Sequence, residues 1–175
     1  MTGSKAVTEA MVADLLCLPA PKVLNTLSQV EEAPAGRMPV VGSAHASYWM
    51  PSAPSIDEPE EWLTVPYSTY EPIPGQYVLK IVGPSVDRVA PEGTYAICQQ
   101  FGEGLHSLPN GKFVHAERER QGEVEWTIKQ VKWDGQKMIL CPHSHHKDHQ
   151  APLMMGTKGD KVRIRGVVLF WHRPA

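Results

Sequence analysis

Apolar and polar positions follow two different rhythms along this chain. From Tyr77 onward, short runs of β-branched and aromatic residues are separated by clusters of Gly, Pro, Asn and Asp, which is typical of strands and turns. The runs are YVLKIV, TYAICQ, KFVHAERE, VEWTIKQVKW, KMILC and VRIRGVVLFW. No helical period of useful length lies between them, so the pattern predicts a mainly β domain over residues 77–175, Greek-key-like or barrel-like.

The first part of the chain has a helical rhythm instead. Residues 5–29 carry apolar residues at helical spacing, interrupted by Pro19 and Pro21, which predicts a short helical segment within residues 1–33. Residues 34–76 predict a linker followed by a long irregular arm, because acids, glycine and proline replace the periodic apolar positions. Long regular elements are excluded from the arm by Pro51, Pro54, Pro59, Pro66, Pro72 and Pro74.

Composition narrows the class of protein. The 175 residues are 42% hydrophobic and carry a formal net charge of −2, so the chain can bury an ordinary core but cannot bind nucleic acid by bulk charge alone. It has no apolar run of membrane-spanning length and no signal-peptide pattern, so we expect a cytoplasmic protein without a membrane partner. Cys17, Cys98 and Cys141 are odd in number and far apart, which does not indicate a disulfide framework.

The stretch LKIVGPSVDRVAPEGTYAI is the first candidate for chemistry. A predicted strand runs into Gly83 and Ser85, and a second strand follows after a turn. Glycine lets the backbone bend sharply, which brings the Ser85 hydroxyl to the surface at a sheet edge. Serine is a poor nucleophile unless a neighbouring base takes its proton, so a second residue is needed.

VEWTIKQV supplies a candidate base. Strand alternation puts Lys129 on the same face as Thr127 and on the face opposite Trp126 and Ile128. If that face points inward, burial disfavours the ammonium and lowers the lysine pKa, so that the neutral amine can accept a proton. Spacing alone also fits a turn serine and a lysine that reaches solvent, and both interpretations stay open at this level.

The order of motifs from Pro39 to Arg173 resembles the C-terminal domain of LexA, phage CI-type repressors and UmuD. The matching pieces are PVVG at 39–42, LKIVGPSV at 79–86, APEGTYAI at 90–97, TIK at 127–129, LCP at 140–142 and RGVVLFW at 165–171. The resemblance implies a largely β domain that forms a homodimer and cuts its own arm with a Ser-Lys dyad, without a cofactor. Ser85 matches the nucleophile and Lys129 the general base.

The same resemblance implies where the arm is cut. Aligning PVVG with the family puts the scissile bond at Ala46-Ser47, where the family prefers Ala-Gly. Two further departures flank the nucleophile: Val86 stands where methionine is usual, and Pro84 removes a backbone N–H beside an oxyanion hole built from such groups. In many members, damage-induced RecA filaments trigger the cut, which separates DNA-binding and dimerising halves.

MVADLLCLPAPKVLNTL near the start has helix-turn-helix spacing. Its second helix would offer Ala20, Lys22 and Asn25 to the major groove of operator DNA. A short helical hairpin that packs on a partner is the other interpretation, because a complete DNA-binding domain needs more helices than residues 1–30 supply.

Two charged clusters are discounted as sites. CPHSHHKDH has the density of a zinc site but no finger spacing and no H-E-x-x-H, so we interpret it as a solvated loop and expect no metal. Alternating charges over residues 117–120 are interpreted as a solvated hairpin end rather than a binding patch.

The sequence therefore favours a LexA/CI-like repressor that dimerises and cuts itself. A non-cleaving dimerisation module is the first alternative, favoured by Pro84 and Ser47. A UmuD-like accessory protein of SOS mutagenesis, which lacks DNA-binding helices, is the second. A processing enzyme at a membrane shares the dyad chemistry, but the absence of an anchor argues against it.

Overall fold

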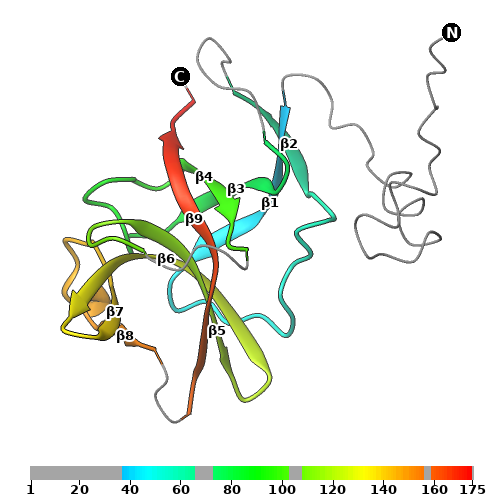
Figure 1. Cartoon of the computed structure of the whole chain (residues 1–175). Helices are drawn as coiled ribbons and strands as arrows, with labels where there is room; N and C mark the ends of the chain where they lie inside the picture. The colour runs from blue at the N-terminus through cyan, green and yellow to red at the C-terminus, as the bar shows by residue number, and fades with distance from the viewer. Residues whose placement is uncertain (1–36, 66–72, 103–107, 156–158, 175) are drawn as a thin grey trace, which may run out of the picture. The chain divides into compact units, whose positions relative to one another are not determined.

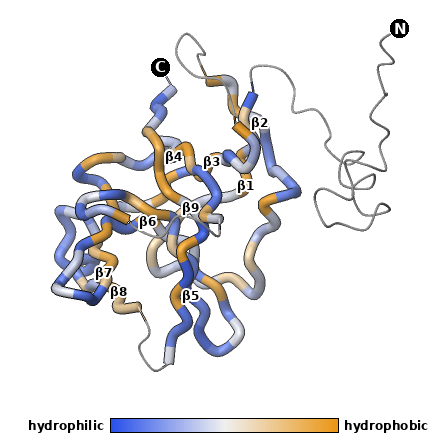
Figure 2. The backbone as a smooth tube through the Cα atoms, viewed as in Figure 1, coloured by the Kyte–Doolittle hydropathy of each residue, from blue (hydrophilic) through white to orange (hydrophobic). Residues whose placement is uncertain are grey.

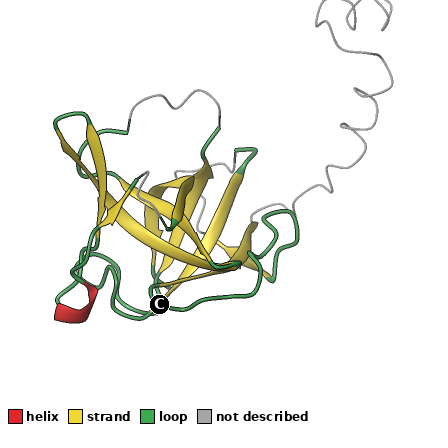
Figure 3. Cartoon of the chain, turned by 90° about the horizontal axis from the view of Figure 1, so that it is seen from below, coloured by secondary structure: helices red, strands yellow, loops and turns green. Residues whose placement is uncertain are grey.

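The runs of β-branched and aromatic residues form strands. The computed structural model describes residues 37–65, 73–102, 108–155 and 159–174, and Figure 1 draws their order. The strands are β1 (Arg37–His45), β2 (Glu61–Thr64), β3 (Gln76–Val82), β4 (Tyr95–Gln100), β5 (Phe113–Arg120), β6 (Glu123–Asp134), β7 (Lys137–Cys141), β8 (Leu153–Met154) and β9 (Lys161–His172). A short 3-10 turn, η1 (Lys147–His149), lies between β7 and β8 (Figure 3).

All of these strands belong to one mixed sheet. Its order is β2-β1-β3-β4-β9-β5-β6-β7-β8, with β1 and β3 parallel and the other pairs antiparallel. The prediction of a mainly β fold is confirmed. The helical segment predicted within residues 1–33 lies outside the described residues.

Part of the segment assigned to the arm is built into the sheet. β1 pairs with β2 on one side and with β3 on the other, and Val40 and Val41 on it are buried. MPVVGSA can form a strand because its single proline, Pro39, precedes Val40, where the pairing with β3 begins. The proline-rich residues 51–59 form no strand, as predicted.

The two halves of the sheet coil over each other. Met50, just beyond β1, forms an isolated antiparallel bridge with Val124 on β6. The main core joins Val41 and Ile81 from one half to Trp126 from the other. Hydrophobic residues follow the strands, whereas the far end of the β5–β6 hairpin is hydrophilic (Figure 2). Coiling therefore brings the end of β1 against β6, two elements that are remote in the sheet order.

A polar pair is buried inside this core. The Tyr77 hydroxyl and His115 Nδ1 share a hydrogen bond of 2.8 Å, and His115 Nε2 has no hydrogen-bond partner in the described part of the chain. Both side chains are fully buried, and burial lowers the pKa of His115 from 6.5 to about 3. Gly166 makes room for this pair, because a Cβ there would overlap the Tyr77 hydroxyl. The glycine of the RGVV run thus has a packing role.

Burial of neutral His115 makes the fold sensitive to acid. The unfolded chain binds a proton near pH 6.5 and the folded chain only near pH 3, so stability falls as the pH drops through this window. Between pH 7 and pH 5 we expect this residue to cost about 2 kcal/mol of unfolding free energy, measured by urea titration. The double variant His115→Leu/Tyr77→Phe should lose that part of the pH dependence. An unchanged slope in the variant would contradict the assignment to His115.

Candidate active site

One face of β6 carries the polar side chains of the site. Glu125, Thr127 and Lys129 alternate with Trp126 and Ile128, which enter the apolar core. The middle of the strand is buried on both faces, and Lys129 is only 5% exposed. Strand alternation thus predicted the face of Lys129 correctly. Because this face is buried, the condition for a lowered pKa of the Lys129 amine is met.

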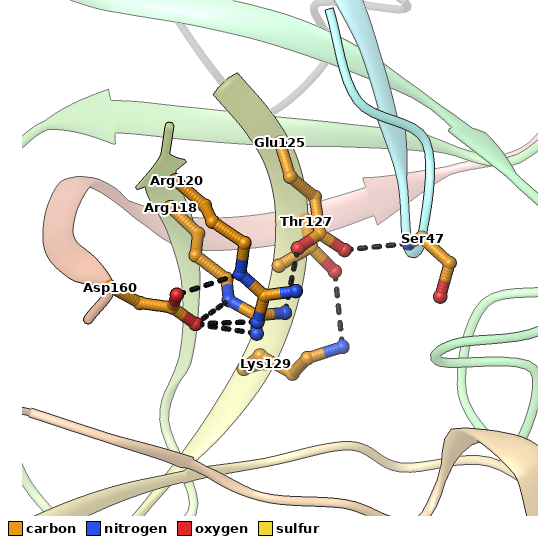
Figure 4. Close-up of polar contacts among 7 residues, drawn as sticks. All are labelled: Ser47, Arg118, Arg120, Glu125, Thr127, Lys129 and Asp160. Atoms are coloured by element: carbon orange, nitrogen blue, oxygen red, sulfur yellow. Dashed lines mark hydrogen bonds and ion pairs between the residues drawn. The ribbon is translucent and has the colours of Figure 1, made fainter. Parts of the chain in front are cut away.

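The surroundings of Lys129 favour its neutral form. Desolvation lowers the pKa of the amine from 10.5 to about 8, and the nearby Arg118 guanidinium acts in the same direction. The Glu125 carboxylate opposes them by stabilising the ammonium. Lys129 Nζ donates a hydrogen bond of 3.1 Å to Thr127 Oγ1, which fixes the direction of the side chain (Figure 4). A base with this pKa is partly unprotonated at neutral pH.

Ser85 begins a tight turn after β3. Gly83 has a φ of +74°, a left-handed conformation that favours glycine, so the predicted bend is present. The predicted exposure of Ser85 at the surface is wrong, because Ser85 is only 2% exposed. The turn is closed by Asp87 N–H donating to Pro84 O and by Ala90 N–H donating to Val86 O. The N–H groups of Ser85 and Val86 come first in this turn and have no backbone acceptor among the described residues. These two donors remain for an oxyanion even though Pro84 has none.

The loop after β7 places the serine turn beside β6. His143 N–H donates to Ser85 O (3.1 Å), and Arg88 N–H donates to His143 O (3.2 Å). Cys141 on β7 is opposite Gln130 on β6, so His143 lies just beyond the position opposite Lys129. Through the hydrogen bond from His143 N–H, the loop after β7 connects Ser85 to the part of the sheet next to Lys129. Among the described residues no hydrogen bond joins their side chains, since the amine donates to Thr127.

The predicted scissile bond lies in a turn at the same place. β1 runs parallel to β3 with His45 opposite Val82, so the chain after His45 reaches the serine turn. Tyr48 N–H donates to His45 O (3.4 Å), and Ser47 has a φ of +69°. Glycine is favoured in that conformation, which gives a physical reason for the Ala-Gly preference of the family. Ala46 is buried and Ser47 is exposed.

A carboxylate from β6 holds the peptide group of that bond. The nitrogen of the Ala46-Ser47 bond is Ser47 N, and its N–H donates to Glu125 Oε1 at 2.6 Å (Figure 4). Glu125 lies on the same strand face as Lys129, two alternate positions away. The structure therefore brings Ala46 and Ser47 to the strand face that carries Lys129.

Sequence reasoning missed Glu125 and its network. Arg118 Nη1 donates to Glu125 Oε2 (3.2 Å), and both Arg118 and Arg120 bond Asp160. The interpretation of residues 117–120 as a solvated hairpin end is wrong for Glu117, which is buried and accepts a hydrogen bond from Trp126 Nε1 (3.1 Å), whereas Arg120 at the end of β5 is exposed. Alternation of acids and bases at a period of two was the available signal, since it separates them onto opposite faces of a strand.

The remaining predicted residues fall in two groups, the DNA-binding candidates and the histidine-rich loop. Ala20, Lys22 and Asn25, predicted to contact DNA, lie outside the described residues. In the histidine-rich loop, His145 N–H and the His146 ring interact with Asp87 on the serine turn, at 2.9 and 3.7 Å. Within the described ranges no group of three or more His, Cys, Asp or Glu could hold a metal, and Cys98 and Cys141 are free thiols.

A mainly β domain with a serine in a turn and a buried lysine on a strand is typical of Ser-Lys peptidase-like domains. A family model described as Peptidase S24-like matches residues 39–169, and the chain belongs to that family, the family of LexA, UmuD and phage CI C-terminal domains. The resemblance noted in the motif order is thereby confirmed. A comparison with curated proteins gave no match. The described ranges contain no helix that could span a membrane.

The electrostatic environment of Lys129 can be tested without any cleavage. In a Ser85→Ala chain, the Lys129 side chain should titrate near pH 8 in a carbon-detected NMR titration. Glu125→Gln removes the charge that stabilises the ammonium, so the pKa of Lys129 should fall further. Glu123→Gln, an exposed acid at the start of the same strand, is the matched control and should leave it unchanged. A Lys129 pKa near 10.5 would contradict the burial argument.

Proposed function

We propose that this chain cuts itself between Ala46 and Ser47, with Ser85 as nucleophile and Lys129 as general base. The observation that carries the proposal is the hydrogen bond from the Ala46-Ser47 peptide N–H to Glu125, on the strand face that also carries Lys129. The proposed substrate peptide is thus bonded to the strand that carries the proposed base. The turn that contains Ser85 is bonded to His143, in the loop that follows the neighbouring strand β7. Membership of the S24-like family supports a peptidase-type domain in general terms.

The proposed chemistry follows from these positions. Neutral Lys129 takes the proton of the Ser85 hydroxyl while Ser85 Oγ attacks the carbonyl carbon of Ala46. The N–H groups of Ser85 and Val86, which have no backbone acceptor among the described residues, are the proposed donors to the resulting oxyanion. Collapse breaks the bond to Ser47 N, which receives the proton from Lys129 and leaves as an amine. Lys129 then takes a proton from a water molecule, whose oxygen attacks the carbonyl carbon of the Ala46 ester. The bond to Ser85 Oγ breaks, Lys129 returns the proton to this oxygen, and Ala46 is released as a carboxylic acid.

A docked arm makes this reaction intramolecular. Effective concentrations of well-placed groups exceed those of free reactants by orders of magnitude, which offsets a modest oxyanion hole. In the cell, such a cut would break the covalent link between residues 1–46, which include β1, and the rest of the chain. We propose that it inactivates a LexA/CI-like repressor that binds operator DNA as a homodimer, with a RecA filament as the trigger.

Pro84 favours the alternative that the domain does not cut itself. It removes a backbone donor next to the nucleophile, and such a donor contributes about 3–4 kcal/mol of transition-state stabilisation in other proteases. A chain with this defect could retain the docked arm and the dimerising domain without cutting. A non-cleaving module of a repressor is therefore the second candidate, and a UmuD-like accessory role is a variant of the first.

Self-cleavage should depend on pH in the way Lys129 titrates. With a pKa of about 8, about one-tenth of the amine is neutral at pH 7 and about nine-tenths at pH 9. The rate of fragment formation, followed by gel electrophoresis and mass spectrometry, should rise about tenfold over that range and then level off. The new amino terminus should be Ser47.

Ser85→Ala and Lys129→Ala should each abolish the fragments at every pH. Lys132→Ala, an exposed lysine on the same strand, is the matched control and should cut at the normal rate. A chain that stays intact at pH 10 would favour the non-cleaving module.

The left-handed conformation of Ser47 gives a second test. A non-glycine residue there costs about 1 kcal/mol in the docked turn, and Ser47→Gly removes that cost. Self-cleavage at pH 8 should become up to about fivefold faster if docking limits the rate. Ser52→Gly, an exposed arm position with an ordinary φ, is the control and should have no effect. A slower Ser47→Gly chain would argue against the turn as the reactive geometry.

A further inference from the structure

The residues that follow the scissile bond are bound to the β5–β6 hairpin. We call residues 47–50 the arm anchor. Its last residue, Met50, exchanges two backbone hydrogen bonds of 2.8 Å with Val124. Its first residue, Ser47, donates to Glu125. Both contacts lie on the carboxyl-terminal side of the bond, next to the start of β6, so the anchor holds the arm from that side.

Two arginines face the ring of Trp49 in the middle of the anchor. Arg118 and Arg120 share one face of β5, and their Cζ atoms lie 5.1 and 5.0 Å from the centroid of a Trp49 ring. This is the distance at which a guanidinium is attracted to the π face of tryptophan, the best of the aromatic acceptors. Trp49 is partly buried by this contact.

The guanidinium groups are held in place by other contacts. Arg120 Nε donates to Asp160 Oδ1 (2.7 Å), and Arg118 Nε donates to Asp160 Oδ2 (2.7 Å), so one carboxylate aligns both groups (Figure 4). Arg118 also donates to Glu125 Oε2. A cation that is already oriented loses less entropy when it stacks on a ring.

We call Arg118 and Arg120, which face the Trp49 ring, the arginine clamp. Glu125 links this clamp to the proposed scissile bond. One oxygen of its carboxylate accepts from Arg118, and the other accepts from the Ser47 N–H. The position of the reactive peptide is therefore tied to the same charges that hold Trp49. Charge-assisted hydrogen bonds of this kind are stronger and geometrically more selective than neutral ones.

We propose that Trp49 is the positioning and specificity residue of the arm, bound as the third residue after the cut by Arg118 and Arg120. This inference rests on the proposed function for the identity of the cut bond. It defines the substrate as a chain segment with a small residue before the bond and an aromatic residue at the third position after it. The neighbouring Tyr48 does not share this role, since it is 54% exposed and stacks on His45.

The test measures docking separately from chemistry. In a Ser85→Ala chain, hydrogen exchange of the arm-anchor amides is followed by mass spectrometry. Trp49→Ala should raise their exchange rate about tenfold, and Trp49→Phe by less, because a phenyl ring keeps part of the attraction. Trp49→Leu keeps an apolar side chain without a π face and should resemble alanine. Trp62→Ala, a partly exposed tryptophan on β2, is the matched control and should not change exchange.

The arginine side gives an independent check. Arg120→Gln removes one stacked cation and should raise anchor exchange about threefold to fivefold, while Arg120→Lys should restore little, because an ammonium lacks the planar group. Arg163→Gln removes an arginine that pairs with Glu117 and Glu119 instead, and it should have no effect on the anchor. If Arg120→Gln and Arg163→Gln raised anchor exchange equally, the effect would come from overall charge, and the proposed role of the arginine clamp would be overturned.

Cleavage of chains with an intact Ser85 separates the two proposals. If the clamp positions the bond, the rate at pH 9 should fall in the order Trp, Phe, Leu or Ala at position 49, in parallel with anchor exchange. Altered exchange in a chain that never cuts itself would leave the clamp standing and reject self-cleavage. Normal cutting with unchanged exchange in Trp49→Ala would reject the clamp alone.

Discussion

Burial of one lysine amine on β6 is the constraint on which the rest of the site depends. The strand needs Trp126 and Ile128 in the core, and alternation then forces Glu125, Thr127 and Lys129 onto the opposite face, where the coiled sheet also covers them. An ammonium in such a place is disfavoured, so its pKa falls to about 8. The same packing that stabilises the sheet therefore prepares a base. Thr127 offers the amine a partner without restoring a full charge.

The arm is coupled to this face by charge rather than by apolar contact alone. Glu125 accepts the Ser47 N–H and a hydrogen bond from Arg118, while Asp160 aligns both Arg118 and Arg120. Glu125 has two effects, because it accepts a hydrogen bond from the Ala46-Ser47 peptide and at the same time stabilises the ammonium of Lys129. Docking of the arm and weakening of the base thus oppose each other through one carboxylate.

Much of the fold, and the strand face on which Lys129 lies, could be predicted from the sequence. Strand runs are local features, and a period of two assigned Lys129 to the correct face. Gly83 predicted a bend before Ser85, and its positive φ confirms this prediction. Glu125 and Trp49 could not be found in this way, because their partners are remote in the sequence. Glu125 binds Ser47, which is 78 residues away, and Trp49 contacts Arg118 on β5. Charged residues at a hairpin end are usually solvated, so composition gave no reason to expect a buried network there.

By itself the sequence determined the class of fold, the order of motifs and the chemical types at positions 85 and 129, because these depend on local periodicity and on residue identity. Only the tertiary structure decided that β1 belongs to the sheet and that the turn at residues 45–48 meets β6. That outcome depends on how strongly the sheet coils, which is set by packing between residues far apart in the chain, such as Val41 with Trp126. Long-range contacts of this kind leave no periodic trace in a single sequence.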